Sequence, residues 1–147
     1  MDQELRRQII LDNYNNPSNK ETVLDESYLK TNTNNSSCID NIDLYTKIED
    51  GIIRDIKFNG EACAISTAST SIMTTELIGK SVDEALKFIN NFDAMINEGE
   101  YDKNVLNEAI VFDEIYKQAN RKTCALLPYK GLLKALNEWK RENISKD

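Results

Sequence analysis

Residues 42–58 read IDLYTKIEDGIIRDIKF. Apolar and polar side chains alternate with a period of two over residues 42–49, which indicates a half-buried β-strand. Asp50-Gly51 is a favoured two-residue hairpin turn, so the apolar residues after it are predicted to return as a second strand. The stretch therefore predicts an antiparallel hairpin at the centre of the fold.

The chain on either side of this hairpin is predicted to be helical. Residues 3–14 carry a rough apolar stripe that is typical of a helix. After the hairpin, Asn59-Gly60 is predicted to form a second turn. Residues 64–78 are small and rich in hydroxyl groups, and we predict a helix there because small side chains permit close packing on a sheet.

The second half of the chain contains further helical patterns. Ser81 and Glu84 match a capping box, and the apolar residues after Ser81 give the clearest apolar face in the chain, extending to Ile96. Another helix is predicted over residues 102–118.

The last helix is predicted to begin near Cys124 and to run to about Asn143. Pro128 sets this start, because proline is best tolerated in the first turn of a helix. No repeat or long linker divides the chain. The predicted fold is α+β, with a small antiparallel sheet of about three strands packed against helices in a single domain, residues 1–147.

Composition excludes several classes of function. The net charge of −7 disfavours nucleic-acid binding, and no apolar run is long enough to suggest a membrane span. The chain contains no histidine, which excludes a histidine base and restricts any zinc site to thiolate and carboxylate ligands. Three cysteines and no signal-peptide pattern favour a cytoplasmic protein with reduced thiols.

The three cysteines and one aspartate suggest a metal site. Cys38 ends a polar loop with Asp40 close by, Cys63 precedes a predicted helix, and Cys124 is placed at the mouth of the last helix near Arg121. Helix N-termini and nearby cations favour the thiolate, which is the form that binds metal and attacks sulfur. The spacing matches no CxxC pair, so the residues alone leave open that the cysteines are ordinary buried side chains.

Motifs spread along the chain favour a metal site over ordinary buried cysteines. The chain resembles the SufU-type branch of the IscU-like iron–sulfur cluster assembly proteins. The matching pieces are Asn16-Pro17-Ser18-Asn19, Cys38-Ile39-Asp40, Gly60-Glu61-Ala62-Cys63-Ala64-Ile65-Ser66-Thr67-Ala68-Ser69, Gly79-Lys80 with Glu84-Ala85, and Arg121-Lys122-Thr123-Cys124 followed by Leu127-Pro128.

The resemblance implies a role for each residue of the site. It implies that Cys38, Asp40, Cys63 and Cys124 hold zinc, and that Cys38 accepts persulfide sulfur from a cysteine desulfurase of the SufS type. Arg121 matches an arginine that the SufU-like branch carries near this site. The implied protein is a zinc-dependent sulfur acceptor or sulfurtransferase that serves downstream iron–sulfur assembly proteins.

Two other functions fit the same residues. The protein could be a scaffold on which a transient [2Fe–2S] cluster is assembled, because thiolates bind iron–sulfur clusters as readily as zinc. It could instead be a structural zinc domain used only for protein interaction, in which no thiol reacts. Ile39 stands where the family usually has glycine, so Asp40 is the ligand whose position is least defined by the motif.

Overall fold

The computed structural model describes residues 1–33 and 40–144. Its elements are α1 Gln3–Asn15, β1 Leu29–Asn32, β2 Asn41–Glu49, β3 Ile52–Glu61, α2 Ala64–Leu77, α3 Val82–Ile96, α4 Lys103–Leu106, the 3-10 helices η1 Asn107–Phe112 and η2 Ile115–Lys117, and α5 Ala119–Ile144. The predicted α+β class is confirmed.

The predicted hairpin is the centre of a three-stranded antiparallel sheet of order β1-β2-β3. Asp50 and Gly51 form its turn with φ of +55° and +73°, as expected for a turn with two left-handed residues. A β-bulge between Lys47 and Ile48 shifts the register by one residue. The strand ends therefore meet with Asn41 opposite Glu61.

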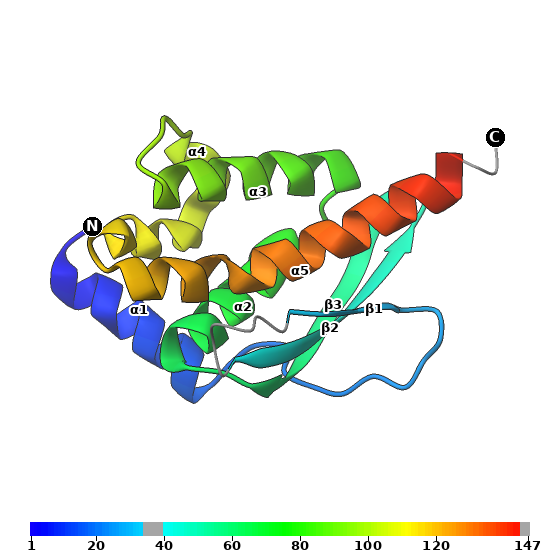
Figure 1. Ribbon diagram of the computed structural model, residues 1–147, viewed down its shortest axis with the longest axis horizontal. Coiled ribbons are helices and arrows are strands. Elements are labelled where there is room, and N and C mark those ends of the chain that lie inside the picture. Colours follow the sequence, from blue (N-terminus) through cyan, green and yellow to red (C-terminus); the bar gives the residue numbers. More distant parts are fainter. Residues whose placement is uncertain (34–39, 145–147) are drawn as a thin grey trace.

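Helices cover one side of this sheet (Figure 1). The long helix α5 runs lengthwise across the molecule and contacts β1, β2, α2 and α3. Among the described residues, no helix combines the length and the apolar character that a membrane span requires.

Helix α2 is buried along most of its length, and its hydroxyl groups find partners inside the protein. Ser69 donates to the carbonyl of Ala125 on α5, and Ser71 donates to Asn13 on α1. Small hydroxyl-bearing side chains thus let α2 pack closely between two helices without leaving buried donors unpaired.

Two sequence predictions about secondary structure are wrong. Asn59-Gly60 does not form a turn, because β3 continues through both residues and Gly60 pairs with Ile42. The single helix predicted over residues 102–118 is broken into α4, η1 and η2. Asn107 lies at the first break with φ of +48°, a conformation that no α-helix can include.

The predicted start of the last helix is also wrong. Helix α5 begins at Ala119 rather than near Cys124, and Pro128 lies in its interior. An interior proline has no N–H to donate to the carbonyl four residues earlier. That carbonyl belongs to Cys124, and it accepts a hydrogen bond from the Ser66 hydroxyl at 3.0 Å. This tertiary contact can replace the bond that proline removes when the Ser66 proton points to this carbonyl.

A hydrogen bond at the sheet gives a pH-dependent prediction. Tyr28 donates to a carboxylate oxygen of Asp55 at 2.6 Å, and this bond, with burial and nearby acidic charge, raises the pKa of Tyr28 to about 12. Because the pKa is higher in the folded state than in the unfolded chain, the stabilisation is complete below about pH 10 and disappears as the pH approaches 12. We expect Tyr28→Phe to lose about 1–2 kcal/mol of stability at pH 8 and almost nothing near pH 12.

Chemical unfolding at a series of pH values measures this difference. Tyr14→Phe is the matched control, because Tyr14 is 44% exposed on α1. A gap between wild type and Tyr28→Phe that stays constant from pH 8 to pH 12 would contradict the prediction.

Candidate metal centre

The hairpin register brings the first two side chains of the site together. Asp40 immediately precedes β2, and Cys63 lies just after β3, at the end of the sheet where Asn41 and Glu61 pair. Asp40 is only 1% exposed, and one of its carboxylate oxygens accepts the backbone N–H of Cys63 at 2.7 Å.

Cys63 is the N-cap residue of α2, in agreement with the prediction that it precedes a helix. Its Sγ accepts the backbone N–H of Ser66 at 3.4 Å. A helix N-terminus carries a partial positive charge, which favours negative charge on a capping group. Cys63 is half-buried and not in a disulfide.

The third side chain of the site, Cys124, lies on α5. It lies in the second turn of the helix rather than at its mouth, because α5 begins at Ala119. Its side chain is half-buried, and its Sγ lies 3.5 Å from the carbonyl oxygen of Asn120, one turn earlier. The sequence placed both cysteines near helix N-termini, and the structure places only Cys63 there.

Asp40, Cys63 and Cys124 each offer one ligand atom, and these atoms lie within 4.8 Å of one another. Ligands 2.0–2.3 Å from a tetrahedral zinc ion lie roughly 3.3–3.8 Å apart, so small side-chain movements would close the set around one ion. Two sulfurs and a carboxylate fit zinc, and the sulfurs also fit an iron–sulfur cluster. The three residues thus leave a tetrahedral ion one further position to fill.

The hydrogen bonds around Asp40 favour its ionised form. Burial raises its pKa, but hydrogen bonds from the Ser66 hydroxyl, the Cys63 backbone and the two thiols outweigh burial, so the pKa lies below its usual value. A carboxylate that stays ionised while buried is a suitable ligand for a cation.

Ser66 is a residue of the site that the sequence did not single out. Its hydroxyl lies 2.6 Å from the second carboxylate oxygen of Asp40, 3.0 Å from the carbonyl of Cys124 and 3.6 Å from the Sγ of Cys63. Ser66 therefore touches all three candidate ligand residues. The sequence signals were its place in the motif around Cys63 and its position three residues after a cysteine at the start of a helix.

The two other predicted site residues, Cys38 and Arg121, are not among the three residues that the structure brings together. Cys38 lies outside the described residues, as does Ile39. Arg121 is exposed in the first turn of α5, three residues before Cys124 and so on the same side of the helix. The functional role that the resemblance implies for Arg121 stays a prediction.

Arg121 also lines an open groove of about 550 Å³ between α1, the N-terminus of α2 and the start of α5. We call it the cationic groove. Its lining is Gln3, Arg6, Arg7, Ile10, Leu11, Ala64, Ile65, Val111, Glu114, Ile115, Lys117, Gln118 and Arg121. Four of these side chains are cationic and one is acidic, which reverses locally the net negative charge of the chain.

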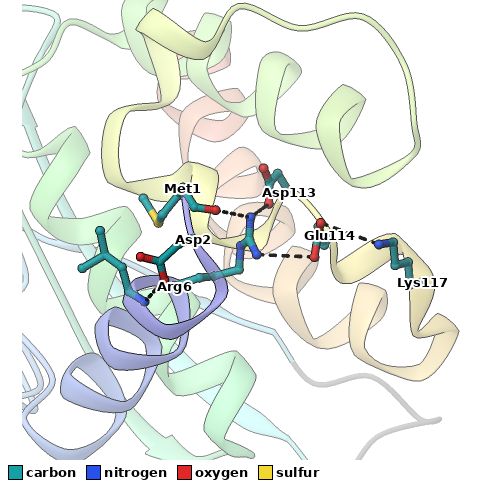
Figure 2. Close-up of polar contacts among 7 residues, drawn as sticks. Met1, Asp2, Arg6, Asp113, Glu114 and Lys117 are labelled. Atoms are coloured by element: carbon teal, nitrogen blue, oxygen red, sulfur yellow. Dashed lines mark hydrogen bonds and ion pairs between the residues drawn. The ribbon is translucent and has the colours of Figure 1, made fainter.

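Two of the four cations of the groove, Arg6 and Lys117, are paired with carboxylates. Figure 2 shows Arg6 of α1 reaching Asp113 at 3.0 Å and Glu114 at 3.3 Å, with Lys117 also paired to Glu114. Arg7 and Arg121 form no ion pair among the described residues, so their charges are available to a partner.

Comparison with known proteins agrees with the fold and shows the family of the chain. The model of the NifU-like N-terminal domain matches residues 5–145. The zinc-dependent sulfurtransferase SufU of Bacillus subtilis is 39% identical, and the match covers 90% of this chain and 89% of that protein. The iron–sulfur cluster assembly scaffold protein IscU of Thermotoga maritima is 35% identical, with 90% and 92% covered.

A solved structure shows the same architecture. It is that of a putative iron–sulfur cluster assembly scaffold protein for the SUF system from Fervidobacterium islandicum AW-1, which is 35% identical. The TM-score is 0.83, with 88% of this chain and 94% of that chain covered.

Proposed function

Since the chain belongs to the family of NifU-like N-terminal domains, we propose that it is a zinc-dependent sulfur acceptor in iron–sulfur cluster assembly. The observation that carries the proposal is the convergence of Asp40, Cys63 and Cys124 within 4.8 Å, in a chain without histidine. The name of the Bacillus relative supports zinc as the metal.

The candidate ligands would have different roles in the proposed metal centre. Asp40, Cys63 and Cys124 would hold the ion, with Cys38 as the fourth ligand. Zinc would supply a positive charge that keeps thiolates deprotonated near neutral pH. Cys63 and Cys124 lie on long helices, which suits anchoring ligands.

The reaction assigned to Cys38 is a sulfur transfer without net redox change. Its thiolate attacks the outer sulfur of a persulfide on the cysteine desulfurase. The S–S bond of that persulfide breaks and leaves a thiolate on the desulfurase, while Cys38 gains the outer sulfur as a new persulfide.

We also propose that the desulfurase docks at the cationic groove. The groove is lined by Ala64, which follows Cys63, and by Arg121, three residues before Cys124. It combines apolar side chains with the exposed Arg7 and Arg121. An acidic surface with apolar side chains would complement it, whereas the rest of this acidic chain would attract basic groups.

The test of this function is the variant Cys38→Ser. We expect it to fold normally, judged by circular dichroism and thermal unfolding, and to lose essentially all stimulation of desulfurase turnover, because serine cannot accept the sulfur. Ser37→Ala is the control and is expected to stimulate as the wild type does. Full stimulation by Cys38→Ser would show that this thiol is not the acceptor.

A scaffold for a [2Fe–2S] cluster is the second candidate function. It is favoured by the 35% identical relative named as a scaffold and by a donor set that also suits iron and sulfide. Anaerobic reconstitution with iron and sulfide separates the two functions. Zinc that is retained without cluster uptake supports the sulfur acceptor, and a stable cluster supports the scaffold.

A further inference from the structure

We propose that Ser66 is a positioning residue of the metal centre, which rests on the proposed function because it concerns the same ion. Its hydroxyl would hold the Asp40 carboxylate against the two cysteines. The same hydroxyl also lies 3.0 Å from the backbone carbonyl of Cys124, which cannot receive an N–H from Pro128.

The backbone N–H and the hydroxyl of Ser66 both contact candidate ligand residues. Ser66 is fully buried in the first turn of α2, three residues after the capping residue Cys63. Its N–H donates to the Cys63 sulfur at 3.4 Å, and its hydroxyl donates to Asp40 at 2.6 Å. A short bond from a buried hydroxyl to a carboxylate is charge-assisted and fixes the orientation of the carboxylate.

Pro128 explains why the same hydroxyl also reaches α5. In an unbroken helix, the N–H of residue 128 would occupy the carbonyl of Cys124, but proline has no N–H. The Ser66 hydroxyl lies 3.0 Å from this carbonyl oxygen. It thereby ties α2, which Cys63 caps, to the turn of α5 that carries Cys124.

The Ser66 hydroxyl has one proton, and two acceptors lie within reach of it, the Asp40 carboxylate and the Cys124 carbonyl. When the charge of Asp40 is drawn toward a cation, the proton can turn to the Cys124 carbonyl instead. The buried hydroxyl therefore keeps a partner whether or not Asp40 is bound to metal. Asp40 can join or leave the ion without leaving the Ser66 hydroxyl unsatisfied.

Ser69 provides a matched control on the same helix. It is equally buried, and its hydroxyl donates to the next carbonyl of α5, that of Ala125, at 2.7 Å. Ser69→Ala and Ser66→Ala each remove a hydroxyl-to-carbonyl contact between α2 and α5. Only Ser66→Ala also removes the bond to Asp40.

The experiment compares zinc affinity in the full-length wild type, Ser66→Ala and Ser69→Ala, measured by competition with a chromophoric chelator. We expect Ser66→Ala to bind zinc about 10–100-fold more weakly, as for other groups that orient metal ligands. Ser69→Ala is expected to stay within about threefold of the wild type, although both variants lower the Tm of the metal-free protein. Equal affinities in the two variants would overturn the inference.

Cobalt(II) supplies a readout that a merely structural role would not change. Its visible absorption reports the ligands directly, and we expect the bands to shift in Ser66→Ala and to stay unchanged in Ser69→Ala. If Ser66→Ala does not fold, Ser66→Thr retains the hydroxyl and must bind zinc within about threefold of the wild type. A folded Ser66→Thr with weak zinc binding would overturn the inference, whereas a wild type that binds neither ion would overturn the proposed metal centre itself.

Discussion

Zinc is expected to raise the Tm of the metal-free protein by roughly 8–16 °C when the free ion exceeds its dissociation constant about 1,000-fold. A ligand that binds only the folded state then stabilises it by about 4 kcal/mol. In a domain of this size, each kcal/mol shifts the Tm by about 2–4 °C. Thermal unfolding after removal of metal with a chelator, with and without added zinc, measures the effect.

Loss of a ligand should remove this stabilisation. Cys63→Ser and Cys124→Ser are both expected to show little or no zinc-dependent shift, because a hydroxyl is a poor substitute for a thiolate. Thr123→Ala, at the position before Cys124, is the control and should respond as the wild type does. Magnesium should have little effect on any of them, since it prefers oxygen ligands. An undiminished zinc shift in both cysteine variants would exclude the proposed ligands.

Gly60→Ala is expected to destabilise the metal-free protein by about 2–6 kcal/mol. A Cβ at this position would lie only 2.1 Å from the backbone oxygen of Asn41, and Gly60 has φ of +133°. The cost combines backbone strain with overpacking, at about 1–3 kcal/mol each. Because Asn41 directly follows Asp40, we also expect weaker zinc binding. Urea unfolding and chelator competition measure the two effects.

Gly79→Ala separates the two contributions. Gly79 also has a left-handed φ, of +93°, but a Cβ there would meet nothing within 4 Å. It should therefore cost only the backbone strain, about 1–3 kcal/mol, and leave zinc affinity unchanged. If both substitutions destabilised the protein equally, the close approach of β3 to Asn41 would not be the cause.

Local patterns predicted the parts of the fold that local interactions determine. The alternation over residues 42–49 and the turn at Asp50-Gly51 gave the hairpin correctly, and the capping box at Ser81 gave the start of α3. The failures occur where tertiary contacts override a local rule. Pro128 lies inside α5, where the Ser66 hydroxyl can donate to the Cys124 carbonyl in place of the missing N–H.

The candidate site was only partly predictable for the same reason. The resemblance named Asp40, Cys63 and Cys124, and the structure brings these three together, while their ligation of metal stays a prediction. Spacing alone could not have joined Cys124 to the others, since its position depends on how α5 packs on α2. Ser66 was not predicted, because its role depends on contacts with two other segments.

The bulged hairpin has a consequence for the order in which the site assembles during folding. Asp40 and Cys63 meet through a hairpin closed by a two-residue turn, and contacts of this local kind form within microseconds. Cys124 arrives only with α5, whose contacts with the sheet span much of the chain and are slower to form. We expect Asp40 and Cys63 to lie close together before α5 packs on the sheet. An ion bound at that stage would have these two donors, and Cys124 would join them once α5 is in place.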